Sequence, residues 1–159
     1  MMMSELDTAW VNLSAENAAD GQRYEQLVFT DLLYRVYIGV ESVPTVRYLV
    51  LEIPESERRH INTFVSPQGF TLFVGDPYVH HEHYVACVLR SSSSDQNDVF
   101  TVVAADILEA LGKEKDSNKY IVILKHRIEK WRSFFKNPVC RKLPDRTVIG
   151  LFGELRFIQ

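Results

Sequence analysis

Hydrophobic residues in the first half of the chain fall in short runs separated by polar turns. β-Branched and aromatic side chains dominate these runs, as is typical of strands. In one run Val46, Tyr48 and Val50 alternate with their neighbours, which predicts a strand with one well-buried face. The short connections favour an antiparallel meander over βαβ units. The runs expected to form strands are 32–40, 45–53, 61–66, 70–75 and 83–91.

The hydrophobic period changes to that of a helix after the serine-rich loop at 91–98. Apolar residues then recur three, four or seven positions apart, which predicts amphipathic helices. Asp116 or Ser117 is the expected N-cap of the second helix. The segments expected to be helical are 99–114, 116–137 and 145–158. The residues expected on the buried stripes are Phe100, Val103, Ile107 and Leu111, then Ile121, Leu124, Ile128, Trp131 and Phe135.

These elements predict an α+β fold, with a small, mostly antiparallel sheet of about four to five strands followed by three helices. The chain has 159 residues, 46% of them hydrophobic, which is enough for one compact domain with its own core. Trp10 and Leu13 would anchor an N-terminal arm or short helix. The expected parts of the domain are this arm over 1–31, a strand-rich region over 32–97 and a helical region over 98–159.

Charge is distributed unevenly along the chain, although the net charge is only −3. Residues 1–31 carry six acidic side chains and one basic side chain, a local charge of −5. Residues 113–146 carry eleven basic side chains and four acidic ones, a local charge of +7. A basic segment of this kind indicates contact with phosphate groups, and the alternative is a solvated helix face.

The basic segment supplies candidate DNA contacts. Phosphate contacts give an affinity that depends on salt and not on base sequence. Trp131 and Phe135 lie among the basic residues, but they belong to the expected core stripe and are not expected to stack on bases. The candidate phosphate contacts are Lys125, Arg127, Lys130, Arg132, Lys136, Arg141 and Lys142.

Patterns for other chemistry are weak or missing in the sequence. His81 and His83 would share one face of a strand and could bind zinc or nickel, but no third ligand is evident, and surface histidines are the alternative. Cys87 lies in an apolar run and is expected to be a core thiol. The sequence has no glycine-rich phosphate loop and no zinc-type cysteine spacing. It also has no signal peptide and no apolar stretch of membrane-spanning length, which favours a cytoplasmic protein without a membrane partner.

The last segment, RTVIGLFGELRFIQ, is unusually apolar. Hydrophobic side chains surround the axis of the expected helix, which predicts that the helix is buried against other polypeptide. Gly150 and Gly153 each cost a helix about 1 kcal/mol relative to alanine, and they indicate close approach of another backbone. Glu154 stands nearly alone among apolar neighbours, so it is either a surface residue at the helix edge or part of a site. We therefore expect another protein chain, or a second copy of this one, to cover the helix.

The strings IEKWRSFF and LPDRTVIGLFGELRFI resemble the PD-(D/E)XK nuclease family found among bacterial restriction and phage-defence genes. The family pattern opens with a W…L element and a strand-rich region. An F…D…L helix, a helix bearing a tryptophan and a GLxGEL signature follow. The chain matches this order over nearly its whole length. The matching residues are Trp10 and Leu13, then Phe100, Asp106 and Leu111, then Trp131, and finally Gly150, Leu151, Phe152, Gly153, Glu154 and Leu155.

The resemblance implies the N-terminal domain of a Mg²⁺-dependent DNA endonuclease. In the family the GEL helix opens the nuclease core, and the Asp and Glu-x-Lys residues that hold the metal lie downstream of it. Glu154 matches the family's early-helix glutamate, which would assist the metal only in an intact core. One carboxylate cannot hold a catalytic Mg²⁺, and the sequence contains no Glu-x-Lys triplet. We therefore expect the chain to be inactive alone and Mg²⁺ to bind only an intact core.

Two other functions stay open on the sequence. The chain could be a free-standing protein-interaction module that binds its partner through residues 145–158. It could also be a small DNA-binding protein that uses its basic C-terminal third.

Overall fold

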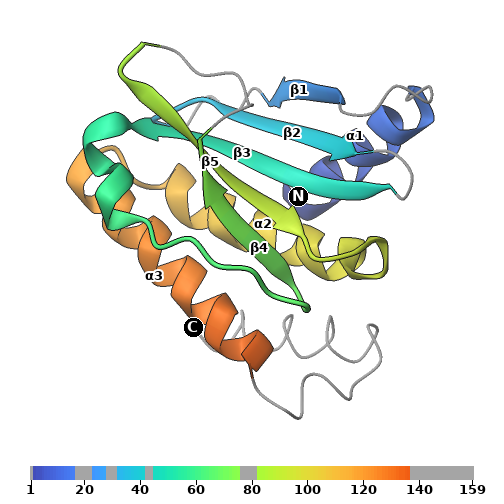
Figure 1. The fold of residues 1–159 in the computed structure, drawn as a ribbon. Coiled ribbons are helices and arrows are strands. Elements are labelled where there is room, and N and C mark those ends of the chain that lie inside the picture. Colours follow the sequence, from blue (N-terminus) through green and yellow to red (C-terminus); the bar gives the residue numbers. More distant parts are fainter. Residues whose placement is uncertain (1, 17–22, 28–31, 42–44, 76–81, 137–159) are drawn as a thin grey trace.

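One antiparallel sheet forms the first layer of the fold (Figure 1). The computed structural model describes residues 2–16, 23–27, 32–41, 45–75 and 82–136. Within this part of the chain the sheet has five strands in the order β1-β2-β3-β5-β4, so that β1 and β4 lie at its edges. Every pair of neighbouring strands is antiparallel. The strands are β1 (Arg23–Leu27), β2 (Val36–Glu41), β3 (Val46–Pro54), β4 (Phe70–Val74) and β5 (Tyr84–Ser91).

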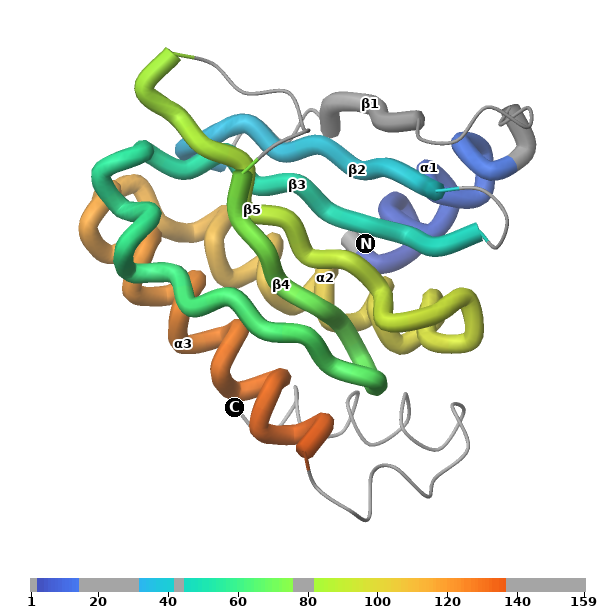
Figure 2. The backbone as a smooth tube through the Cα atoms, in the orientation of Figure 1, coloured from blue at the N-terminus to red at the C-terminus, as the bar shows by residue number. Residues whose placement is uncertain are grey.

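Helices form the second layer and cover one face of the sheet. The backbone trace shows α2 and α3 running beneath the sheet and α1 beside α2 (Figure 2). The side chain of Asp116 caps α3 by accepting a hydrogen bond of 2.9 Å from the backbone N–H of Asn118, which confirms one of the two predicted caps. The α-helices of the described residues are α1 (Met2–Glu16), α2 (Asn97–Gly112) and α3 (Ser117–Lys136), and the 3₁₀ helices are η1 (Glu55–His60) and η2 (Ser94–Gln96).

The main hydrophobic core lies between the sheet and the three helices. Both predicted helical stripes are buried, including Phe100, Ile107 and Leu124 with no exposed surface. Cys87 also lies in this core, where burial raises the pKa of its thiol to about 12, so the prediction of a core thiol is confirmed.

Strand β3 is buried on both faces, and not on one face as its alternation predicts. Leu49 and Leu51 face the helices, whereas Tyr48 and Val50 belong to a second apolar cluster on the opposite face. The ring of Tyr48 lies over Gly39 of the neighbouring strand so closely that a side chain at position 39 would collide with it. A central strand with two covered faces explains why nearly all of its side chains are inaccessible.

The α+β class is confirmed, with differences in detail. Helix α1 lies in the N-terminal segment expected as an arm or short helix, and α2 and α3 follow the sheet as predicted. The segment expected as a strand over 61–66 makes one isolated bridge, Phe64 to Leu72, and the segment before it forms η1. Strand β1 was not predicted. The helix expected over 145–158 lies outside the described residues.

No helix in the described part of the chain is long and apolar enough to cross a membrane.

Candidate nucleic-acid interface

The exposed side of α3 concentrates positive charge. The helix carries six lysine or arginine side chains, and Glu129 is its one acidic residue. Its opposite side is the apolar stripe that packs in the core, so the cations can project only from the remaining surface. Helix α1, on the same face of the sheet, carries acidic residues and no lysine or arginine.

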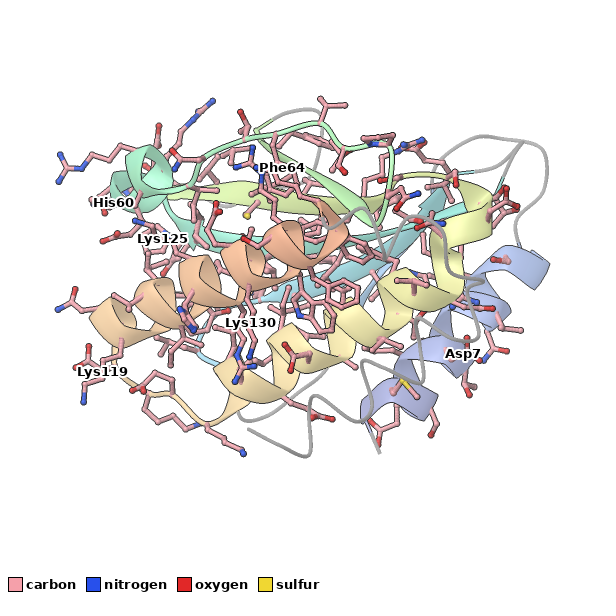
Figure 3. All side chains as sticks on the ribbon, turned by 90° about the horizontal axis from the view of Figure 1, so that it is seen from below. Asp7, His60, Phe64, Lys119, Lys125 and Lys130 are labelled. Carbon is pink, nitrogen blue, oxygen red and sulfur yellow. The ribbon has the colours of Figure 1, made fainter. Side chains whose placement is uncertain are left out.

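Six of the α3 side chains fall into two rows with the same spacing. Residues seven and eleven positions apart share a helix face, because 3.6 residues make one turn. The α2-side row is Lys119, His126 and Lys130. The η1-side row is Lys125, Arg132 and Lys136. Viewed from below the sheet, Lys125 lies toward His60 of η1, and Lys130 lies toward α2 (Figure 3).

The η1-side row borders a small groove between η1 and α3. A cavity of about 100 Å³ lies there, and its lining includes His60, Lys125 and Glu129. Further along the row the guanidinium of Arg132 stacks over the ring of Phe64 at 4.4 Å and approaches the carboxylate of Glu129 at 3.6 Å. Arg132 is therefore partly occupied by contacts within the protein, whereas Lys125 is exposed at the rim of the groove.

A buried carboxylate fixes α3 to α2. Asp106 accepts a hydrogen bond of 2.8 Å from the indole N–H of Trp131, and the guanidinium of Arg127 lies 3.4 Å from the same carboxyl group. The side chain of Asp106 is 9% exposed, so these donors replace water around the charge. This contact sets the rotation of α3 about its axis and thereby the direction of both cationic rows.

The predicted phosphate contacts divide into three groups in the structure. Lys125, Lys130 and Lys136 are exposed, and no ion pair joins them to another described residue. Arg127 and Arg132 are half-buried and engaged with Asp106, Phe64 and Glu129 as described above. Arg141 and Lys142 lie outside the described residues. Lys119, which is exposed in the first turn of α3, was not among the predicted contacts, although its spacing from Lys130 could have placed it there.

The N-terminal helix is fixed to the sheet through Trp10. This side chain has no exposed surface, its indole N–H donates a 3.0 Å hydrogen bond to the carbonyl of Gly39, and its ring centroid lies 5.7 Å from that of Phe100. Arg47 of β3 stacks on the indole at 5.5 Å and hydrogen-bonds to Asp7 at 2.9 Å. Trp10 therefore joins α1, β2, β3 and α2.

The family-pattern residues that the structure describes are all buried. Trp10 contacts Phe100, and Trp131 contacts Asp106, so these four residues position the helices and are not exposed for chemistry. They give the pattern a structural meaning: it marks the contacts that assemble the helical layer on the sheet.

The described residues do not fit a metal site. No group of three or more His, Cys, Asp or Glu side chains among them is placed to hold a metal ion. His83 lies in the turn before β5 with a φ of 71°, and not on a strand as predicted, while His81 lies outside the described residues. Glu154 is also outside them, so its expected role stays a prediction.

Comparison with known proteins identifies the family. A family model described as "Putative PD-(D/E)XK family member, (DUF4420)" matches residues 6–159. No curated protein and no solved structure gives a significant match. The matched range contains the two buried tryptophans, the Asp106 contact and the cationic rows of α3. The chain therefore belongs to the PD-(D/E)XK family DUF4420.

Proposed function

We propose that this chain is the DNA-contacting N-terminal domain of a PD-(D/E)XK endonuclease of the restriction or phage-defence type. The observation that carries the proposal is the pair of cationic rows on the exposed side of α3. Family membership supplies DNA as the polyanion, and the rows supply a surface that can meet its phosphates. The proposed setting is the cytoplasm of a bacterium, where such a protein would meet foreign DNA.

The geometry of the rows suits a nucleic-acid backbone. Each row extends over eleven residues, which is about 16 Å along the helix axis. Phosphates repeat about every 3.4 Å along one strand of DNA, so one row can reach phosphates several nucleotides apart. The anchored tryptophan of α3 limits the reorganisation that binding requires, since the helix direction is already set by Asp106.

The proposal assigns contact, and not hydrolysis, to the described residues. The chemistry of the family needs clustered carboxylates around Mg²⁺ with a lysine near the attacking water. The sequence contains no Glu-x-Lys triplet, and the described residues contain no cluster of potential ligands. We therefore expect this chain to leave DNA uncut when Mg²⁺ is added, and we expect cleavage to need an intact D…ExK core.

The salt dependence of DNA binding tests the proposal. Binding of a fluorescent duplex would be followed by anisotropy for the wild-type chain and for Lys125→Gln/Lys130→Gln, at salt concentrations between about 50 and 200 mM. Each lost phosphate contact makes the slope of log affinity against log salt shallower by about 1, so the double variant should lose about 2.

A matched control separates the rows from net charge. Thr8→Glu/Asn12→Glu places two charges on exposed positions of α1, and it changes the total charge by the same amount as the lysine variant. It should keep the wild-type slope. A wild-type chain that does not bind duplex DNA, or equal slopes for the lysine variant and the wild type, would contradict the proposal.

A further inference from the structure

A stripe of three residues without positive charge runs between the two cationic rows of α3. Successive residues of a helix are turned by about 100°, since 3.6 residues make one turn, so the two rows lie about 120° apart on the exposed side. Val122, Glu129 and Ser133 fall between the rows, at spacings of seven and four residues that place them on one face. All three are exposed, and together we call them the median stripe.

The median stripe differs in chemistry from the rows beside it. Val122 is hydrophobic and yet 65% exposed. Glu129 is the one acidic residue of the helix, and Ser133 adds a hydroxyl that can both donate and accept hydrogen bonds. A valine and a carboxylate add nothing to the attraction for phosphates. The rows therefore suit a phosphate backbone, whereas the median stripe suits groups that are apolar or donate hydrogen bonds.

The carboxylate of Glu129 is oriented by a neighbour but stays open to solvent. Its side chain is 52% exposed, and the guanidinium of Arg132 approaches one of its oxygens at 3.6 Å. Arg132 is itself held by stacking on the ring of Phe64 at 4.4 Å. An ionised carboxylate has about four lone-pair sites, so one contact of this length leaves acceptor sites for a ligand. Arg132 therefore restricts the position of Glu129 without covering it.

A helix with this division of charge fits the major groove of duplex DNA. The groove is about 12 Å wide, and a helix with its side chains is about 10–12 Å in diameter. The two flanks of a helix in the groove face the phosphates of the two walls, and the line between the flanks faces the base edges. Lys125 and Lys130 lie on either side of α3 when it is viewed from below (Figure 3), so that each row can meet one wall.

We propose that α3 enters the major groove and that its median stripe reads base edges. This inference rests on the proposed DNA contact, and it adds sequence readout to a surface that is otherwise blind to sequence. Glu129 accepts a hydrogen bond from the N4 amino group of cytosine, and Val122 contacts the C5-methyl group of thymine. Ser133 can pair with any base and is assigned no preference.

The spacing along the helix predicts which bases are read together. In zinc-finger helices, residues three or four positions apart contact successive bases. Val122 and Glu129 are seven positions apart, which corresponds to two such steps. The thymine and the cytosine should therefore lie two positions apart in the site.

Selection from a pool of DNA duplexes tests the readout. Each duplex carries a randomised segment of about ten base pairs, which is one helical turn, and the duplexes bound by the full chain are sequenced. The wild type should enrich cytosine at one position and thymine two positions away, each roughly fivefold over the other bases. Glu129→Gln should change the preferred cytosine to adenine, because an amide pairs with N6 and N7 of adenine. Val122→Ser should lose the thymine preference alone.

Matched variants separate base readout from charge. Glu82→Gln removes one negative charge from the exposed turn before β5, as Glu129→Gln does from α3, and it should keep the wild-type preferences. Lys125→Gln/Lys130→Gln should weaken binding to every sequence alike and leave the preferred bases unchanged. Two results would overturn the readout while the phosphate contact stands: duplex binding by the wild type with no base enriched, and an unchanged cytosine preference in Glu129→Gln. A wild-type chain that binds no duplex contradicts the proposed function as well.

Discussion

Helices α1 and α3 lie on opposite sides of α2, and each is attached through one buried tryptophan. Their exposed surfaces nevertheless carry opposite charges. Each inserts one tryptophan whose indole N–H reaches a buried acceptor. For Trp10 the acceptor is the backbone carbonyl of Gly39 in the sheet, and for Trp131 it is the carboxylate of Asp106 on α2. The outer side of α1 is acidic, whereas that of α3 carries the two cationic rows.

The comparison shows that the attachment of the helices and the proposed DNA contact rest on different residues. The family pattern coincides with the attachment residues, because Trp10, Phe100, Asp106 and Trp131 are all buried at helix contacts. The lysines of α3 do not belong to that pattern. A change at the tryptophans should therefore alter stability, and a change at the lysines should alter DNA affinity with little effect on stability.

The largest expected effect is at the attachment of α1. Trp10→Ala removes a fully buried ring, its contact with Phe100 and its hydrogen bond to Gly39, and should lower the free energy of unfolding by about 3–5 kcal/mol. Urea denaturation followed by circular dichroism measures this. Val11→Ala, at the next and half-exposed position, should change stability by less than about 0.5 kcal/mol. Equal costs for the two variants would show that α1 is not held by its tryptophan.

Breaking the attachment of α3 should cost less stability than breaking that of α1, and the cost should depend on the charge of Asp106. Asp106→Ala removes the hydrogen bond to the Trp131 indole and the ion pair with Arg127, which should cost about 2–3 kcal/mol. Asp106→Asn keeps an acceptor for the indole and should cost about 1 kcal/mol less. The same denaturation measurement applies. If asparagine costs as much as alanine, the charge contact with Arg127, and not the indole hydrogen bond, is the stronger part.

Local periodicity was enough to predict most of this architecture. The helical stripes through Phe100 and Trp131 are both buried, because a 3.6-residue repeat leaves one face for the core. Strand β1 was missed because its sequence, RYEQL, has no run of β-branched residues, and its pairing with β2 stabilises it as an edge strand. The bend of His83 into a left-handed turn likewise depends on the connection to β5 and not on the local histidine pattern.

The candidate interface was predictable in composition but not in geometry. The basic segment correctly indicated Lys125 and Lys130 as exposed cations on one helix. The sequence could not reveal that Arg127 meets a carboxylate 21 residues earlier or that Arg132 stacks on Phe64, because both contacts join segments that are distant along the chain.

The smallest expected effect concerns a polar atom that distinguishes the two helices further. The hydroxyl of Tyr120, in the first turns of α3, is buried and has no hydrogen-bond partner among the residues that the structure describes, whereas the indole N–H of Trp10 on α1 is satisfied. A buried unpaired hydroxyl costs free energy, and Phe fills nearly the same volume without it. Tyr120→Phe should therefore stabilise the protein by about 1 kcal/mol at pH 7.

The stability advantage of Tyr120→Phe should also depend on pH. Burial raises the pKa of the Tyr120 hydroxyl above its ordinary value of 10.0, with further raising contributions from Cys87 and Tyr34. Above about pH 10 the unfolded chain releases this proton while the folded chain keeps it, so the wild type loses stability as pH rises further. The phenylalanine variant has no such proton, and its advantage should widen between about pH 10 and pH 11 in parallel urea titrations. An advantage that stays constant or shrinks over this range would contradict the raised pKa, because the folded chain would then release the proton as readily as the unfolded chain.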